Sequence, residues 1–370
     1  MARSNAATVH SGADTTVVRH WNRDAVLSTL RDHTKITLSA LARETGLSRP
    51  TATVVLEELV DRGLIVQHAP AVGGTGRPAR RYSFRSRAGY ALGLSIEPDR
   101  ILAVATDLDG IIVARGERET SPELPAPKRL ELARELAARS ADDAGPIWAV
   151  GVASSGVIDR DGHVRRSNQI PGWTGLPLAD TVGSWFGRRG LAGNDGSLAA
   201  LGEKWQGIAQ YSEDVALILT GHRIGQGILL GGELHIGQSG AAGELGKLLH
   251  DQEWNPTSVL DSTGLSAQDI FSAARDGEER SLELSEMIAE RTARSASVLV
   301  SVLDPQLVVI AGDFTAGGPE FLDAVRRHLG TMCVSAPQVA LSTLGNDAAP
   351  LGAARLALDD LEARQYLLES

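Results

Sequence analysis

Cysteine is almost missing from this chain of 370 residues, in which Cys333 stands alone. A single thiol excludes a disulfide within the chain and a zinc site built from several cysteines. Long apolar runs are missing as well, since no stretch approaches the ~20 residues that a membrane-spanning helix needs. The first residues, MARSNAATVHSGADTT, are polar and lack the apolar centre of a signal peptide. We therefore expect a cytoplasmic protein without a membrane-inserted segment.

The charge that is present is divided unevenly along the chain. Residues 1–87 contain 13 Lys and Arg against 7 Asp and Glu, which leaves 23 and 39 of the totals for residues 88–370. The first part is therefore net positive by 6 charges and the second net negative by 16, for a total of −10. A small basic unit on a large acidic body is the distribution that a DNA-binding head on an effector domain needs.

Helical spacing begins after an arm at residues 1–17, which shows little periodicity and is expected to be mobile. A first helix is predicted from Trp21 onward, with apolar residues at 26, 27 and 30. A second, short helix is capped by Thr37 or Ser39. Gly46 follows it and suits the tight turn between two helices.

A third helix is predicted to begin at the N-cap Ser48, with Pro50 in its first turn, where a missing N–H costs little. Gly63 ends this helix, and a strand begins at residues 64–66. We expect its buried face to consist of Val54, Val55, Leu59 and Val60.

Helix, turn, helix and strand, followed by the glycine-rich hairpin AVGGTGRPARRYSF, predict a winged helix-turn-helix over residues 18–87. The first turn of the third helix, where Ala52 is also expected to be presented, usually faces base edges, and arginines of a wing suit a narrow minor groove. The predicted DNA-binding residues are Ser48, Arg49, Thr51, Thr53, Arg77, Arg80 and Arg81. The alternative is a helix pair that only packs, with its arginines on a solvated face.

From Ala88 onward the sequence alternates strands and helices, with an early β-meander in each half. This pattern predicts an α/β body of two lobes with a cleft between them. Strands are expected at 90–97, 100–110, 111–119, 147–159, before Asn194, within 215–234 and at 307–312. Helices are expected at 125–142, after the Asn194–Asp195 pair and at 284–303.

Four local sequences of the body suit a ligand site. GLSIEPDRI lies where a β-hairpin turn usually cradles a phosphate, but Glu97 repels phosphate and Pro98 lacks an N–H. SNQIPGW places Asn168 on a loop, the Asn194–Asp195 pair opens a helix, and GQSGAAGELGK places Glu244 in a Gly/Ala-rich turn. Each has a structural alternative, such as Asp195 acting only as an N-cap.

Together these segments resemble the ROK family of repressors, open reading frames and sugar kinases, and specifically its repressor branch. The resemblance covers about residues 20–365. It implies an actin-like, hexokinase-type body at residues 88–370 that binds sugar between two lobes. The segments that carry it are ETGLSRPTATVVLEELVDRGLI, GRPAR, SNQIPGW, GNDGSLAALGE, TGHRIGQGILLGGELHIGQSGAAGELGK and LDPQLVVIAGD.

The resemblance also implies roles for individual residues. Asp195 matches the general base of the family's kinases, and Asn168 and Glu244 match residues that contact sugar. The first phosphate loop, Asp-x-Gly-Gly-Thr in the family, reads SIEPD here, and the second, Gly-Thr-Gly-Ile-Gly, reads GHRIG. Lys247 replaces the family's histidine and either reaches a sugar acid or phosphate or is a surface lysine. The family's cysteine-built zinc cluster is absent, so neither a metal nor ATP is expected.

These observations predict a repressor of carbohydrate uptake or metabolism genes that is controlled by a sugar or sugar derivative. Its expected partners are a double-stranded DNA operator, the sugar and a second copy of the chain, in a dimer or a tetramer. Asp195 is then a sugar ligand, and phosphoryl transfer is lost. Two alternatives stay open: an ATP-dependent sugar kinase that carries a DNA-binding head, and a regulator that senses a protein partner.

Overall fold

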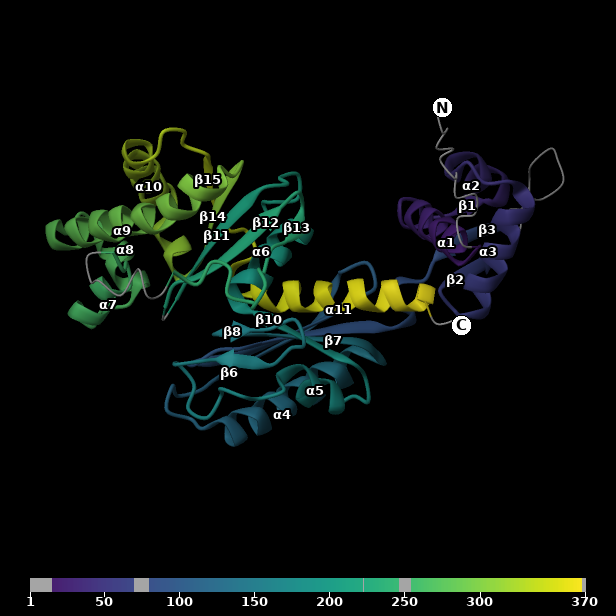
Figure 1. Cartoon of the computed structure of the whole chain (residues 1–370), viewed down its shortest axis with the longest axis horizontal. Coiled ribbons are helices and arrows are strands. Elements are labelled where there is room, and N and C mark those ends of the chain that lie inside the picture. Colours follow the sequence, from purple (N-terminus) through teal and green to yellow (C-terminus); the bar gives the residue numbers. More distant parts are fainter. Residues whose placement is uncertain (1–14, 70–79, 222, 246–253, 368–370) are drawn as a thin grey trace, which may run out of the picture. The chain divides into compact units, whose positions relative to one another are not determined.

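Figure 1 shows the computed structural model, which describes residues 15–69, 80–221, 223–245 and 254–367. The chain divides into two compact units. The head unit comprises residues 1–88 together with 362–370, and the body unit comprises residues 89–361. The body therefore ends before residue 370, because residues 362–370 group with the head unit, where Glu362 pairs with Arg31 at 2.7 Å.

The head unit is built on helices α1 (Thr15–Arg31), α2 (Leu38–Thr45) and α3 (Arg49–Asp61). Helix α1 begins inside the expected arm, of which residues 1–14 lie outside the described part of the chain. The Thr37 side chain caps α2 by accepting the Ala40 N–H, and Ser48 caps α3 by accepting the Thr51 N–H. Gly46 has a φ of +70°, which allows the sharp turn between α2 and α3.

The buried face of α3 differs from the one that the sequence predicts. Val54 is 57% exposed, and Ala52, expected at the DNA-facing surface, is fully buried. Buried positions spaced by three and four residues place one stripe against α1 and α2. That stripe consists of Ala52, Val55, Leu56 and Leu59. Helix α3 is therefore rotated relative to the prediction, and Val54 lies outside the core.

A small sheet completes the head unit. Its strands, in the order β1-β3-β2, are β1 (Ile36–Thr37), β3 (Arg81–Phe84) and β2 (Ile65–His68). Strand β3 pairs antiparallel with both neighbours, with Tyr82 opposite Ile36 and Phe84 opposite Ile65. The hairpin between β2 and β3 is the predicted wing, and its residues 70–79 lie outside the described residues. A 3₁₀ turn, η1 (Ser86–Ala88), leads out of the unit.

The two sheets of the body unit share one topology. In each, three strands form an antiparallel meander, a later strand pairs in parallel with the first of these, and a last strand pairs in parallel with that later one. The first sheet, in the order β10-β7-β4-β5-β6, contains β4 (Tyr90–Ile96), β5 (Arg100–Asp107), β6 (Ile112–Glu119), β7 (Ile147–Ser154) and β10 (Gly190–Asn194). The second, in the order β13-β12-β11-β14-β15, contains β11 (Val215–Thr220), β12 (Gly225–Leu230), β13 (Glu233–Leu234), β14 (Leu307–Gly312) and β15 (Gln338–Leu341). The predicted two-lobed α/β architecture is confirmed.

Shorter elements and helices connect these strands. The first lobe adds α4 (Ala126–Ala144), the hairpin of β8 (Val157–Ile158) and β9 (Val164–Arg166), α5 (Leu178–Ser184) and α6 (Asp195–Gln206). The second adds α7 (Ser258–Thr263), α8 (Ala267–Arg275), α9 (Glu279–Leu303), η3 (Asp313–Gly317), α10 (Gly318–Met332), η4 (Gly345–Asp347) and α11 (Ala348–Leu367). The predicted strands and the helices α4, α6 and α9 are found with differences at their ends, whereas helices α5, α7, α8, α10 and α11 were not predicted.

Side chains alternate between the two faces of the second sheet. In β11, Ala216 and Ile218 pack with α8, α9 and α10, whereas Val215 and Leu217 pack with α6 and α11. Helix α11 also lies against the first sheet, on the face opposite α4 (Figure 1). A β-carbon at Gly93 would lie 1.9 Å from the Pro350 carbonyl oxygen, so glycine is required for this close packing. Helices α6 and α11 therefore form a layer shared by both lobes.

Candidate DNA-binding surface and sugar-binding site

The N-terminus of α3 presents the polar residues that the sequence predicts. Ser48 and Arg49 are exposed, and Thr51 and Thr53 are half-buried. Hydrogen bonds hold these side chains in place: the Ser48 and Thr51 hydroxyls lie 2.8 Å apart, and Thr53 donates to the Arg49 carbonyl at 2.9 Å. The Arg49 guanidinium donates to the Ser39 hydroxyl of α2. An exposed helix start with ordered hydroxyls and a cation suits a phosphate backbone or a base edge.

The arginines at the start of β3 are the second part of this surface. Arg80 and Arg81 are both exposed, whereas Arg77 lies outside the described residues. Strand β3 is fixed from behind by Arg31, whose guanidinium carbon lies 4.8 Å from the centre of the Phe84 ring. The arrangement provides a basic strand end next to the predicted wing.

In the body unit, the carboxyl ends of three parallel strands meet. The register pairs Ile96 of β4 with Ser154 of β7, and Ser154 with Asn194 of β10. The next residues along the three strands are Glu97, Ser155 and Asp195. The carboxyl edge of a parallel sheet is where α/β proteins commonly bind ligands.

The SNQIPGW loop is anchored at this edge by its tryptophan. Trp173 is fully buried, and its indole N–H donates to the Ser154 hydroxyl at 2.9 Å. Ser154 donates in turn to the Ile96 carbonyl at 3.0 Å. The Thr174 hydroxyl closes the loop by donating to the Ser167 carbonyl at 3.1 Å, and Asn168 is exposed on it. Asn168 is thus held on a loop that is bonded to the ends of β4 and β7.

Asn194 and Asp195 have different roles, because only Asn194 caps helix α6. Asn194 is the N-cap of α6, since its side-chain oxygen accepts the Ser197 N–H at 3.1 Å and its amide donates to the Gly156 carbonyl at 3.0 Å. The structural alternative for Asp195, that it is the cap, is therefore wrong. Burial raises the pKa of Asp195 to about 6, and the charge of Glu244 adds to the increase. A half-buried carboxylate of this kind is suited to accept hydrogen bonds from sugar hydroxyls.

Backbone of the second lobe packs beside Asp195 and its neighbour Gly196. A β-carbon at Gly225 would lie 3.5 Å from Asp195 Oδ1, in ordinary contact, whereas one at Gly196 would lie only 2.6 Å from the Gln226 carbonyl oxygen, so Gly196 has no room for a side chain. The loop that carries Glu244 packs equally closely on the first lobe, because a β-carbon at Gly240 would lie 1.9 Å from the Ile158 carbonyl oxygen. Strands from both lobes therefore surround Asp195.

Glu244 lies in this loop and shares its electrostatic environment with an arginine of the first lobe. Desolvation raises the pKa of the Glu244 carboxyl, and the nearby charge of Arg166 opposes the increase. Of the predicted sugar-binding set, the structure thus brings Asp195 and Glu244 within electrostatic range and holds Asn168 on the adjoining loop. Lys247 lies outside the described residues.

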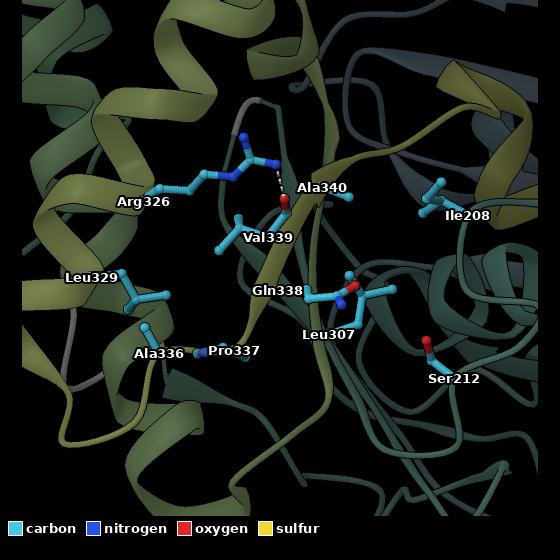
Figure 2. Close-up of a pocket in the computed structure, with 10 residues that line it drawn as sticks. All are labelled: Ile208, Ser212, Leu307, Arg326, Leu329, Ala336, Pro337, Gln338, Val339 and Ala340. Atoms are coloured by element: carbon cyan, nitrogen blue, oxygen red, sulfur yellow. Dashed lines mark hydrogen bonds between the residues drawn. The ribbon is translucent and has the colours of Figure 1, made fainter.

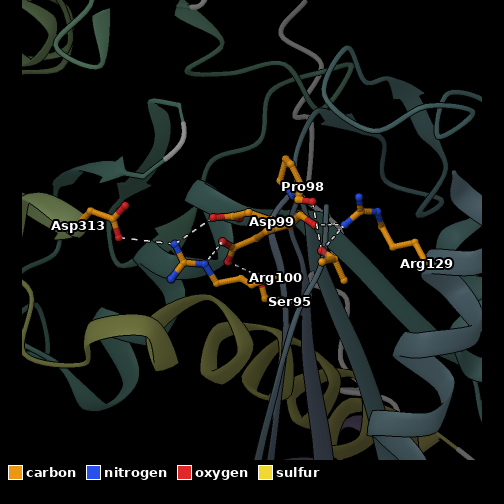
Figure 3. Close-up of polar contacts among 8 residues, drawn as sticks. Ser95, Pro98, Asp99, Arg100, Arg129 and Asp313 are labelled. Carbon is orange, nitrogen blue, oxygen red and sulfur yellow. Dashed lines mark hydrogen bonds and ion pairs between the residues drawn. The ribbon is translucent and has the colours of Figure 1, made fainter. Parts of the chain in front are cut away.

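The turn between β4 and β5 holds a network of charged side chains (Figure 3). Arg100 pairs with Glu97 at 3.4 Å and with Asp99 at 3.4 Å, both in the first lobe. It also reaches Asp313 of the second lobe at 3.6 Å. Burial raises the pKa of Glu97 to about 7, although Arg100 and a hydrogen bond from Ser95 lower it.

Arg129 of α4 holds the backbone of this turn. Its fully buried guanidinium donates to the Glu97 carbonyl at 2.6 Å and to the Thr120 hydroxyl at 2.8 Å. Thr120 donates in turn to the Pro98 carbonyl at 3.1 Å. Arg129 therefore holds the backbone of the turn, while the carboxylates of Glu97 and Asp99 pair with Arg100 (Figure 3).

The comparison with known families decides the identity of the body. Residues 91–259 and 256–360 match the ROK family, which is well over half of the chain. This chain belongs to the ROK family. Residues 25–74, within the head unit, match the MarR family.

Relatives of this ROK protein include both regulators and kinases. It is 22% identical to the xylose repressor of Bacillus subtilis, over 94% of this chain and 97% of the repressor. Among solved structures, a ROK family transcriptional regulator described as a homolog of the E. coli MLC protein matches with a TM-score of 0.72 at 18% identity, over 95% of this chain and all of that one. A ROK family glucokinase from Streptomyces griseus, solved with glucose and AMPPNP, matches with a TM-score of 0.65 at 24% identity, over 73% of this chain and all of that one.

Several residues of this ROK site were not predicted from the sequence. Arg100, Arg129 and Asp313 are single charged residues without a local pattern, and their partners are distant in the chain. Ser154 lies in the strand expected at 147–159 and Trp173 in the SNQIPGW segment, but neither was predicted as a site residue. The tryptophan of SNQIPGW was the available signal for the contact with Ser154, because an indole N–H that becomes buried needs an acceptor.

No metal centre is found in the described part of this ROK chain, where no three His, Cys, Asp or Glu side chains gather as ligands. His250 and Asp251, in the segment where the resemblance would place a zinc cluster, lie outside the described residues. Cys333 lies at the C-terminal end of α10 and offers one thiol, which does not fit a cysteine cluster. Among the described helices, none has the length and apolar character to cross a membrane.

A separate pocket of about 520 Å³ opens between α10 and β15 (Figure 2). Arg326 lies at its side and donates to the Val339 carbonyl at 2.7 Å, which covers part of the outer edge of β15. None of the predicted site residues lines it. The lining residues are Ile208, Ser212, Leu307, Arg326, Leu329, Ala336, Pro337, Gln338, Val339 and Ala340.

Proposed function

We propose that this ROK protein is a transcriptional repressor of carbohydrate uptake or metabolism genes. Its head unit binds an operator in double-stranded DNA, and its body binds a sugar or sugar derivative beside Asp195. The observation that carries the proposal is a basic winged helix-turn-helix joined to a ROK body whose first phosphate loop holds Glu97. The xylose repressor similarity extends over head and body alike, which supports the same combination of roles.

The body is not expected to act as an enzyme. A nucleotide phosphate at the β4–β5 turn would meet the carboxylates of Glu97 and Asp99 and a proline that lacks an N–H. Phosphoryl transfer depends on positive charge and backbone N–H groups around the transferred group, and at this turn the charge of Arg100 is already paired with Glu97 and Asp99. ATP does not fit these residues, and Asp195 acts as a sugar ligand rather than as a base. Zinc is not required for the same site.

DNA binding and sugar binding are linked through the assembly. A dimer, or a dimer of dimers, places two head units on two half-sites whose spacing follows the helical repeat of DNA. A sugar that binds the lobes in one arrangement better than in another shifts the spacing of the heads and weakens operator binding. The protein acts where the operator is, in the cytoplasm.

The head assignment is tested by Arg49→Ala and Arg77→Ala in a fluorescence-anisotropy titration with DNA from upstream of the protein's own gene. Each is expected to weaken specific binding by about tenfold or more, because a charged hydrogen bond to DNA is lost. Arg118→Ala is the control, since Arg118 pairs with Glu135 in the body unit. Unchanged operator affinity in both head variants would contradict the assignment.

The sugar site is tested separately by Asp195→Asn. This change keeps the shape of the side chain and removes the acceptor charge, so the release of DNA by sugar should be lost while DNA affinity stays the same. Asp180→Asn in α5, an exposed carboxylate, is the matched control. Sugar-dependent phosphate release from ATP in the unmodified protein would favour the kinase alternative. Operator binding that no sugar affects would favour a protein partner as the signal.

A further inference from the structure

Glu97 occupies a position that the proposed sugar site shares with Asp195. The register places Glu97, Ser155 and Asp195 one residue beyond the paired positions of β4, β7 and β10. Neighbouring strands lie about 4.8 Å apart, so the backbones of Glu97 and Asp195 are separated by two strand spacings, about 10 Å. Two acidic side chains at that separation lie within electrostatic range of each other. Consistent with this, the charge of Asp195 contributes to raising the pKa of Glu97.

The Glu97 side chain is held in one arrangement. The Ser95 hydroxyl donates to Glu97 Oε1 at 3.0 Å, and Arg100 Nε lies 3.4 Å from Glu97 Oε2 (Figure 3). The backbone carbonyl of the same residue accepts from Arg129. Each oxygen of the Glu97 carboxylate thus has a partner, which fixes where its charge lies.

Buried polar atoms beside the two carboxylates have no hydrogen-bond partner. The Ser155 hydroxyl, on the strand between Glu97 and Asp195, belongs to a residue that is 2% exposed. The side-chain amide nitrogen of Gln226, next to Gly196, belongs to a residue that is 6% exposed. Unsatisfied buried polar groups are uncommon, and a ligand rich in hydroxyl groups supplies their missing partners.

The charges beside Asp195 favour a neutral ligand. Arg100 is shared among Glu97, Asp99 and Asp313, and Arg166 lies near Glu244, so the carboxylates here outnumber these two arginines. The Asp195 carboxylate accepts the Gly196 N–H at 2.8 Å. A phosphate ester placed beside Asp195 and Glu97 would meet like charge from two sides, whereas a hydroxyl would donate to either carboxylate.

We propose that Glu97 is a specificity residue of the sugar site, which selects an uncharged, hydroxyl-bearing sugar and rejects its phosphate ester. The inference rests on the proposed function, because it assumes that a sugar binds beside Asp195. It adds the chemical class of the effector and assigns a binding role to the residue that replaces the first glycine of the family's phosphate loop.

The test is isothermal titration of the full chain at about pH 8, above the pKa of about 7 of Glu97, with neutral hexoses, pentoses and N-acetylated hexoses and with the phosphate ester of each. The wild-type protein should bind one neutral sugar at least about tenfold more tightly than its phosphate ester. In Glu97→Gln the ratio of the two affinities should fall by about tenfold, because one of the repelling charges is gone. Glu131→Gln, an exposed carboxylate of α4 that pairs with Lys128, should keep the wild-type ratio.

The outcomes separate the inference from the proposed function. If no sugar or sugar phosphate binds, the proposed sugar site itself fails. If a phosphate ester binds more tightly than the neutral sugar, or if Glu97→Gln leaves the ratio unchanged, the role of Glu97 is wrong while the sugar site stands. If the variant does not fold, the ratio is measured in the wild-type protein at low and high salt. High salt screens the repulsion of the phosphate ester, so the ratio of the two affinities should be smaller at high salt than at low salt. A ratio that does not change with salt would overturn the proposal.

Discussion

The two lobes of the body share a strand order, but their first turns differ in chemistry. The first turn, residues 97–99 between β4 and β5, carries two carboxylates and a proline and is bonded from below by Arg129. The second turn joins β11 to β12, and residue 222 within it lies outside the described residues. At its end Gly225 lies beside Asp195, since a β-carbon there would be 3.5 Å from Asp195 Oδ1. The two turns therefore differ: the first is filled by charged side chains, and the second ends in a glycine next to Asp195.

The difference bears on the proposed loss of phosphoryl transfer. A turn that receives an anion needs backbone N–H groups and available positive charge, and in the first turn Arg100 is already paired with the carboxylates of Glu97 and Asp99. The second turn reads GHRIG, which also departs from the phosphate loop that the resemblance implies. Under the proposed function, both turns have lost phosphate-loop residues, and Asp195 stays as the expected sugar ligand.

The largest expected effect concerns the close packing beside the second turn. Gly196→Val places a side chain where a β-carbon alone would lie 2.6 Å from the Gln226 carbonyl oxygen. Because the obstacle is backbone, we expect a loss of about 4 kcal/mol in the free energy of unfolding, measured with urea. Gly330→Ala in α10, where a β-carbon meets nothing within 4 Å, is expected to raise stability by up to about 1 kcal/mol. Similar losses in both variants would show that Gly196 is not specially constrained.

The next prediction tests whether Arg129 holds the turn between β4 and β5 in place. Arg129→Met removes a fully buried guanidinium and leaves the Glu97 carbonyl and the Thr120 hydroxyl without this donor. We expect a loss of about 3 kcal/mol in unfolding free energy. The neighbouring Lys128→Met, whose side chain is 52% exposed, should change stability by less than about 0.5 kcal/mol. An Arg129 variant as stable as the Lys128 variant would contradict the account of the turn.

A smaller effect follows from the raised pKa of Glu97. Burial, with Asp195 and Asp99, raises this pKa from 4.5 to about 7, against Arg100 and Ser95, which lower it. Between these values the folded state binds the proton more tightly than the unfolded state, so stability decreases as the pH rises through that window. The measurement is the free energy of unfolding at about pH 5 and at about pH 8. Its decrease between the two pH values should be larger in the wild type than in Glu97→Gln, by on the order of 1–3 kcal/mol.

The control for the pH experiment is Glu131→Gln, which should lose as much stability as the wild type over the same range. A part of the loss should persist in Glu97→Gln, because the pKa of Asp195 is also raised, to about 6. An unchanged pH dependence in Glu97→Gln would mean that Glu97 is not the group that titrates.

The smallest effect concerns the ion pair that connects the first turn to the second lobe. Arg100 and Asp313 are 3.6 Å apart, and the Asp313 side chain is 39% exposed. A double-mutant cycle of Arg100→Gln and Asp313→Asn should give a coupling energy of about 0.5 kcal/mol in urea unfolding. A coupling above about 2 kcal/mol would mean that the network clamps the lobes together rather than only filling the turn.

Periodicity and capping residues predicted most of the fold, because those signals act over short distances in the chain. Ser48, Thr37 and Gly46 stand at the helix ends where the sequence placed them. The rotation of α3 was not predicted correctly, because TATVVLEELV contains two overlapping apolar stripes. Only packing against α1 and α2 selects the stripe with Ala52, and that information is not local.

The site was predicted in part, for the same reason. Asp195, Glu244 and Asn168 follow from a resemblance of short segments, and the structure shows how the first two come close. The contacts of Arg129 with Glu97 and of Trp173 with Ser154 join residues far apart in the chain. No pattern within one segment predicts such pairs. Which of Asn194 and Asp195 caps α6 could be decided only from the hydrogen bonds in the structure.

The central claim is that DNA binding by the head is controlled by a sugar in a body that no longer uses ATP. Its most direct test is a fluorescence-anisotropy titration of the wild-type protein with DNA from upstream of its own gene, at fixed salt, since salt sets such affinities. A panel of sugars is added with and without ATP. The account predicts tight, sequence-preferring binding that one sugar releases equally well in the presence and absence of ATP. No preference over random DNA, or release that occurs only when ATP is turned over, would contradict it.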